Sequence, residues 1–66
     1  MKIESEKYVI ASRTFPLEFD DGNGENVNDI NEAFLYPLEG SAEAELECFD
    51  EPENYRVLRI KITYEI

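Results

Sequence analysis

The stretch at residues 42–66 reads AEAELECFDEPENYRVLRIKITYEI and decides the fold. Its first part, Ala42 to Cys48, alternates small or apolar residues with glutamate, and this period of two is typical of a half-buried strand. Residues 50–54 combine Asp, Glu, Pro and Asn, a composition that favours a turn. From Tyr55 to Ile66 the chain alternates again and is rich in β-branched residues, as strands prefer. The stretch therefore predicts a C-terminal β-hairpin.

The register of this hairpin follows from its two apolar faces. These faces must coincide, because a slip of one residue would turn every core side chain outward. Pairing Cys48 with Leu58 meets that requirement, and the same register sets Glu47 opposite Arg59 and Glu45 opposite Lys61. Opposite charges across a strand pair contribute ~0.2–1 kcal/mol each.

The middle of the chain predicts a short helix. Asp29 and Glu32 fit a capping box, in which Asp29 is the N-cap and Glu32 the third helical residue. An apolar stripe follows at Ile30, Ala33 and Phe34, spaced for one helical face. Pro37 ends the helix after about two turns.

Two apolar runs in the N-terminal third, at residues 8–11 and 15–19, predict further strands, which are either separate or one bent strand. Pro16 places the second run at a sheet edge or a bulge, and residues 20–26 predict a loop. Together these elements predict an α+β fold in a single domain, residues 1–66. We expect an antiparallel sheet of three to four strands, one short helix and the C-terminal β-hairpin.

Charge is distributed unevenly along the 66 residues, which carry 16 acidic and 6 basic side chains for a formal net charge of -10. Between Thr14 and Tyr55 there are thirteen acidic residues and no basic one. A field of this sign repels nucleic acid and anionic lipid and attracts cationic surfaces. We therefore expect no direct binding of nucleic acid and no membrane association, and a protein partner with a basic surface.

Catalytic residue types are scarce. The chain has no His, and the predicted strand places its one cysteine, Cys48, on the inward face, where a thiol is inert. Neither a Gly-rich phosphate loop with its Lys nor a zinc constellation is present. We therefore expect a protein that is not an enzyme and binds no cofactor.

A calcium loop is an alternative interpretation of the central acidic segment. Taking Asp21 as the first position puts Asn23, Glu25, Asp29 and Glu32 at positions where EF-hand loops place ligands. The match fails at the sixth position, where the motif needs Gly for a sharp turn and the chain has Asn26. Loops rich in Asp and Asn also occur for turn reasons alone, so we assign no metal ligand.

Glu43, Glu45 and Glu47 form an evenly spaced acidic row on the predicted strand Ala42 to Cys48. Carboxylates at every second strand residue repeat every ~6.7 Å, comparable to the spacing of phosphates along a nucleic-acid strand. The competing interpretation is a solvated sheet face neutralised by Arg59 and Lys61. The predicted partner-binding surface combines this row with the acids around it: Asp20, Asp21, Glu25, Glu32, Glu39, Glu43, Glu45, Glu47, Asp50, Glu51 and Glu53.

In size, charge and the row Glu43, Glu45, Glu47, the chain resembles the small acidic phage-encoded anti-defence inhibitors, namely anti-CRISPR proteins and other DNA mimics. The resemblance is one of class, because these proteins share no signature sequence. It implies an inhibitor that occupies the basic DNA-binding channel of a CRISPR effector complex or nuclease and blocks target DNA. Arg56, Arg59 and Lys61 depart from it, since a pure mimic needs no positive edge.

Other interpretations remain open alongside this leading hypothesis. An immunity or antitoxin protein that caps one toxic enzyme would use aromatic anchors such as Tyr36, Phe49 or Tyr55. An accessory subunit would pair an edge strand with a larger chain. We expect a monomer or a small homo-oligomer. The start of the chain has no apolar signal region, so we expect a cytoplasmic protein, in the host-cell cytoplasm if it is phage-encoded.

Overall fold

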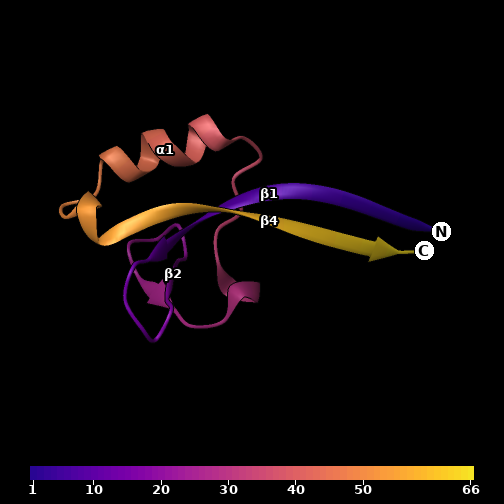
Figure 1. Ribbon diagram of the computed structural model, residues 1–66, viewed down its shortest axis with the longest axis horizontal. Coiled ribbons are helices and arrows are strands. Elements are labelled where there is room, and N and C mark those ends of the chain that lie inside the picture. The colour runs from indigo at the N-terminus through magenta and orange to yellow at the C-terminus, as the bar shows by residue number, and fades with distance from the viewer.

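The computed structural model describes residues 1–66 and contains one four-stranded antiparallel sheet and one α-helix (Figure 1). The strand order is β3-β2-β1-β4. The elements follow one another as β1 (Lys2–Ser12), β2 (Phe19–Asp20), β3 (Asn26–Val27), the 3-10 turn η1 (Ile30–Glu32), α1 (Glu39–Glu47), the 3-10 turn η2 (Pro52–Asn54) and β4 (Tyr55–Glu65). The predicted α+β class, with an antiparallel sheet and one short helix, is confirmed.

The two long strands, β1 and β4, pair antiparallel over their full length and form the backbone of the molecule. Their register sets Val9 opposite Leu58 and Lys2 opposite Glu65. The predicted strand at residues 55–66 is confirmed, but the predicted hairpin is wrong, because the partner of β4 is β1 and not the segment before it. The far half of this β1–β4 ribbon extends beyond the other elements and gives the molecule a length of 42 Å (Figure 1).

The segment predicted as the first hairpin strand is the helix α1. Its alternation of apolar residues and glutamate relied on Ala42 and Ala44, and Ala and Glu are poor strand residues and good helix formers. Ala42 is fully buried, and Leu46 and Phe49 pack with it against β1 and β4. This spacing of four and three residues is that of one helical face. The predicted pairing of Cys48 with Leu58 is therefore wrong.

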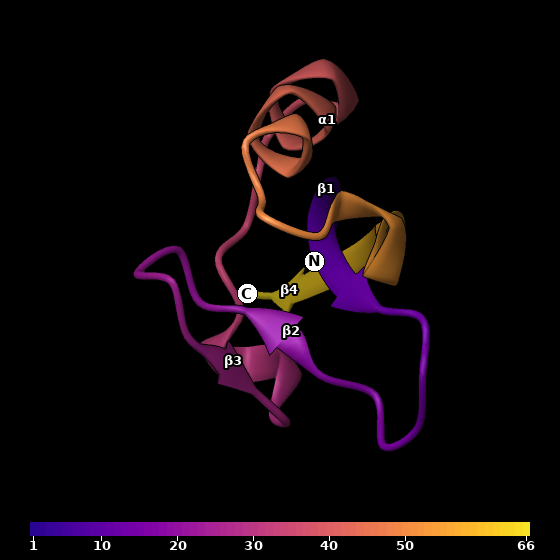
Figure 2. The ribbon, with the colours of Figure 1, turned by 90° about the vertical axis from the view of Figure 1, so that its left-hand side faces the viewer.

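The core is divided between the two faces of the β1–β4 ribbon. On one face Ile10, Tyr36 and Ala42 form a cluster beneath α1. On the other face Val9 and Ala11 pack with Phe19, supported by partly buried residues that include Leu17, Val27, Ala33, Leu58 and Ile60. Figure 2 shows α1 on one side of the ribbon and β2 and β3 on the other. Alternate residues of β1 therefore serve two thin cores, which explains why Val9, Ile10 and Ala11 are consecutive and all fully buried.

The charged residues of β4 pair with β1 and not with the helix. Lys61 Nζ lies 3.4 Å from a carboxylate oxygen of Glu4, and Arg59 lies 4.0 Å from Glu6. The predicted pairs of Arg59 with Glu47 and of Lys61 with Glu45 are wrong, because they depended on the hairpin. The ion pairs that do form are more than half exposed, so each contributes little to stability.

The predictions for the first half of the chain, two strands and a short helix, were partly right. Residues 8–11 lie within β1, whereas only Phe19 of the predicted strand at residues 15–19 is in a strand, because residues 13–16 form a bend. Asp29 is an N-cap and its side chain accepts a hydrogen bond from the Asn31 amide, but it caps the three-residue turn η1 and not a two-turn helix. None of the helices is long and apolar enough to cross a membrane.

Candidate partner-binding cleft

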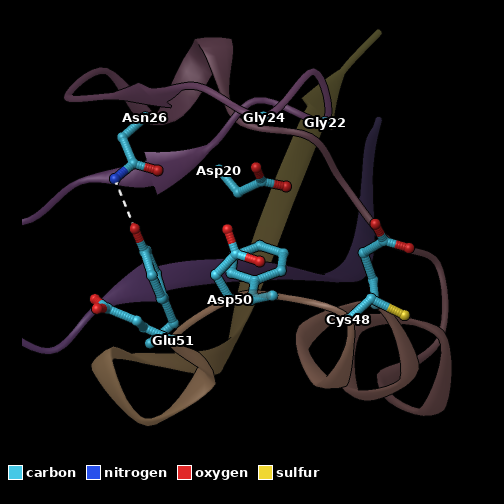
Figure 3. Close-up of a pocket in the computed structure, with 10 residues that line it drawn as sticks. Asp20, Gly22, Gly24, Asn26, Cys48, Asp50 and Glu51 are labelled. Atoms are coloured by element: carbon cyan, nitrogen blue, oxygen red, sulfur yellow. Dashed lines mark hydrogen bonds between the residues drawn. The ribbon is translucent and has the colours of Figure 1, made fainter.

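A cleft of about 520 Å³ opens between the end of α1 and the turn that joins β2 to β3 (Figure 3). Ten residues line it: Asp20, Gly22, Gly24, Asn26, Glu45, Cys48, Phe49, Asp50, Glu51 and Tyr55. Four of them are carboxylates and none is basic. In Figure 3 the side chains of Asp20 and Asp50 point into the cleft from its two sides.

Two aromatic side chains hold the helical side of the cleft in place. Phe49 and Tyr55 pack edge to face, with ring centroids 5.1 Å apart, and both rings belong to the cluster beneath α1. The Tyr55 hydroxyl accepts a hydrogen bond of 2.9 Å from the side-chain amide of Asn26 on β3 (Figure 3). This bond joins the two sides of the cleft, so the position of Asp50 and Glu51 is coupled to the β2–β3 turn.

The β2–β3 turn is organised by Asp21. Its Oδ1 accepts hydrogen bonds from the amides of Asn23 at 2.8 Å and Glu25 at 3.2 Å. Gly22 and Gly24 have φ values of 85° and 88°, where side chains are strained. A Cβ atom on Gly22 would also lie 2.6 Å from the Phe34 ring. Turn chemistry thus accounts for this acidic segment, and no group of three or more acidic, Cys or His side chains is arranged to hold a metal ion.

Asp20 is the buried carboxylate of the cleft, with 6 % of its surface exposed. Burial raises the pKa of Asp20 above its ordinary value of 3.8; the Gly22 amide lowers the pKa, and the charges of Asp21 and Glu45 raise it further. The same environment raises the pKa of Tyr36 to about 12, through burial first and then the charges of Asp20 and Glu45. Burial and the neighbouring carboxylates thus act in the same direction, and both raise the pKa of Asp20 and of Tyr36.

Replacing Asp20→Asn is expected to raise the free energy of unfolding at pH 7 by on the order of 1 kcal/mol, because it removes a buried charge without a counterion. The raised pKa means that the folded chain holds this proton to a higher pH than the unfolded chain does. The destabilisation by Asp20 is therefore absent below its ordinary pKa of 3.8 and grows as the pH rises through the raised value. Urea unfolding at neutral pH and at about pH 3 measures the difference.

The control for this prediction is Asp50→Asn, which removes an exposed charge from the same cleft. It should change the unfolding free energy much less. A less stable Asp20→Asn variant at neutral pH would contradict the assignment of Asp20 as a destabilising buried charge.

The predicted site residues are only partly brought together. Asp20, Glu45, Asp50 and Glu51 line the cleft, and Asp21 and Glu25 lie in the turn beside it. The others lie outside its lining: Glu39, Glu43 and Glu47 on α1, Glu32 in η1, and Glu53 in η2.

The predicted acidic row Glu43, Glu45, Glu47 is wrong as a strand face, because these residues are helical. A row of a different kind is present on α1. Glu39, Glu43 and Glu47 are spaced by four residues and share one face of the helix, where carboxylates recur every ~6 Å along the axis. Glu45 lies apart from this row and lines the cleft.

Cys48 was predicted to be buried and is exposed. Cys48 is the C-terminal cap of α1, and its thiol donates a hydrogen bond of 3.6 Å to the Ala44 carbonyl oxygen. The misplacement follows from the wrong strand assignment of Ala42 to Cys48.

None of the thirteen carboxylates between Thr14 and Tyr55 forms a salt bridge. The two ion pairs of the molecule use Glu4 and Glu6 on the ribbon. Arg13, the cation that precedes this segment, donates from its guanidinium to the Tyr55 carbonyl oxygen and not to a carboxylate. The acidic surface around the cleft is therefore unneutralised within the chain.

Six lining residues lie outside the predicted acidic surface: Gly22, Gly24, Asn26, Cys48, Phe49 and Tyr55. Phe49 and Tyr55 were indicated by the sequence only as aromatic anchors of the immunity alternative. Gly22 and Gly24 carried a signal, since closely spaced glycines among Asp and Asn predict a tight turn. The pairing of Asn26 with Tyr55 carried no signal, because their hydrogen bond joins residues 29 positions apart. No protein-family model, curated protein or solved structure matches the chain.

Proposed function

We propose that this protein is an inhibitor that binds the basic nucleic-acid-binding surface of a protein such as a CRISPR effector complex or a nuclease, and thereby blocks access of DNA. The observation that supports it is the unneutralised acidic surface: thirteen carboxylates between Thr14 and Tyr55 without a salt bridge. Crowding like charges destabilises a compact chain. A cationic partner relieves that repulsion on binding.

The geometry suits recognition of arginine and lysine side chains. Glu45, Asp50 and Glu51 present exposed carboxylates around one open cleft, and an ionised carboxylate accepts two parallel hydrogen bonds from a guanidinium. The helical row Glu39, Glu43 and Glu47 adds charges at ~6 Å intervals along α1. A protein groove that holds successive phosphates meets a similar series of negative groups here.

The alternative of an immunity protein would use aromatic anchors, and two of the three residues named for it, Phe49 and Tyr55, line the cleft. Tyr36 is buried under α1, whereas Phe49 and Tyr55 are partly buried against the same cluster and also line the cleft. The more exposed aromatic side chains are Phe15, Phe34 and Tyr64, and they lie outside the cleft. The cleft acids carry the proposal.

The test is capture of partners from bacterial lysate on the tagged protein, with elution in steps of rising salt and, in parallel, with duplex DNA. We expect nucleic-acid-binding proteins, identified by mass spectrometry, that leave the column at moderate salt and are displaced by DNA, because the contacts are electrostatic. A single small enzyme that stays bound through high salt and ignores DNA would replace the proposal with an immunity function.

A further inference from the structure

The outer edge of β4 has no neighbouring strand, since β4 is the last strand of the sheet. Met1 and Ile66 exchange two backbone hydrogen bonds, of 2.6 and 2.8 Å, at the end of the β1–β4 ribbon. Because backbone groups alternate in direction along an antiparallel strand, the even-numbered residues of β4 face β1. The odd-numbered residues from Val57 to Glu65 therefore direct their N–H and C=O groups to the open edge.

The far half of the ribbon has one charged face and one apolar face. Ion pairs of Glu4 and Glu6 with β4 cover the charged face. On the apolar face Ile3 is 46 % exposed and Tyr64 50 % exposed, although both lie in strands. A hollow of about 370 Å³ adjoins this face, lined by Ile30, Leu35, Ile60 and Ile62 together with Asn31, Lys61 and Thr63. An open, partly apolar strand edge of this kind is a template for pairing.

Charge and the length of strand overlap together select one two-fold register for a second copy along this edge. The hydrogen bonds between the two copies come from the outward N–H and C=O groups of odd-numbered residues, so odd-numbered residues must lie opposite one another. Even-numbered residues then also lie opposite one another, and the two apolar faces coincide. Centring the axis on Ile62 sets Arg59 opposite Glu65 of the second copy, an opposite-charge pair made twice. Centring it on Lys61 sets Lys61 opposite itself. Centring it on Thr63 sets Lys61 opposite Glu65, but this register pairs fewer residues and leaves Arg59 beyond the end of the second strand. The Ile62 register is therefore the one that satisfies the charges over the greatest length.

We infer that the chain forms a two-fold homodimer in which the β4 strands of two copies pair antiparallel around Ile62. On the apolar face Ile60 then lies opposite Tyr64 of the second copy, which brings that ring beside the hollow at Ile60. The equivalent edge of β1 is shorter, because Tyr8 already pairs with Tyr36 through hydrogen bonds of 2.8 and 2.9 Å. Figure 1 shows that α1 and β2 lie away from the two termini. Because the cleft is lined from these elements, it stays open in this dimer.

Replacing Thr63→Pro tests the edge directly. The Thr63 amide points away from β1, so proline removes an intermolecular hydrogen bond and leaves the β1–β4 ladder intact. Sedimentation equilibrium from micromolar to millimolar protein should show a dimer for the native chain and for Thr63→Val, which keeps the amide. The Thr63→Pro variant should be monomeric throughout, with an unchanged circular dichroism spectrum. A native chain that is monomeric at every concentration, or an undiminished Thr63→Pro dimer, would overturn the inference.

A cysteine crosslink tests the register. Because Ile62 meets its own copy as a non-hydrogen-bonded pair, the Cα atoms should be about 4.5 Å apart, within the range that a disulfide spans. In a Cys48→Ser background, Ile62→Cys should give a covalent dimer on mild oxidation, whereas Ile60→Cys should not, because residue 60 faces Tyr64 of the second copy. Equal crosslinking of the two variants, or none at residue 62, would contradict the Ile62 register.

Discussion

Reversing the charge of Glu45, Asp50 and Glu51 together to lysine is expected to weaken binding to the captured partner by about a thousandfold. Hydrogen bonds to charged groups contribute about 1.5–3 kcal/mol each, and every 1.4 kcal/mol is a factor of ten in affinity. These three side chains are exposed and line one cleft, so the triple variant changes the proposed partner-binding surface and leaves the buried core residues unchanged. Isothermal titration of the variant and the native chain against the purified partner measures the change.

A matched control distinguishes the cleft from overall charge. Replacing Glu18, Glu32 and Glu53 by lysine changes the net charge by the same amount and leaves both the cleft lining and the helical row on α1 intact. This second triple variant should lose much less affinity, mainly through slower association at low salt. Equal losses in the two variants would show that the chain acts as a diffuse polyanion, and retained binding in the first would remove the cleft from the proposed function.

The second large effect is expected at the centre of the sheet, where Ile10→Ala should lower the free energy of unfolding by about 2–5 kcal/mol. Ile10 is fully buried and joins the β1–β4 ribbon to Ala42 of α1 and to Tyr36. A chain of this size buries a smaller fraction of its surface than larger domains do, so its stability margin is narrow. The variant should be substantially unfolded at 37 °C, as measured by thermal and urea denaturation.

The same truncation at Ile3 provides the comparison. Ile3 lies on the same strand but is 46 % exposed on the far half of the ribbon. In dilute protein, Ile3→Ala should cost less than about 1 kcal/mol, because it removes few buried contacts. Similar losses at both positions would mean that the ribbon, and not the packing beneath α1, limits the stability of the fold.

The features that the sequence predicted correctly are local. The strand at residues 55–66 was identified because β-branched residues and strict alternation agree there. The turn at residues 50–54 and the glycine-containing turn after Asp20 follow from backbone preferences that act over a few residues. The run of acidic residues without cations is visible in the sequence itself, because no Lys or Arg lies between Thr14 and Tyr55.

The pairing of strands and the state of residues 42–48 were decided by tertiary structure. The alternation of Ala and Glu at Ala42 to Cys48 fits a strand by period and a helix by propensity, so the local pattern alone does not choose between them. The choice follows from β1, because it supplies the whole partner edge for β4 and leaves a sheet face that Ala42 and Leu46 cover from a helix.

The candidate cleft depended on the same decision. Asp20 and Glu45 are 25 positions apart in the chain, and they line one cavity only because α1 packs across the sheet end that carries β2. The hydrogen bond between Asn26 and Tyr55 fixes the two sides, and no local pattern encodes it. The sequence by itself thus determined the sign of the surface and the local turns, whereas packing of the helix on the sheet determined which carboxylates meet, since contacts between distant residues form only in the folded chain.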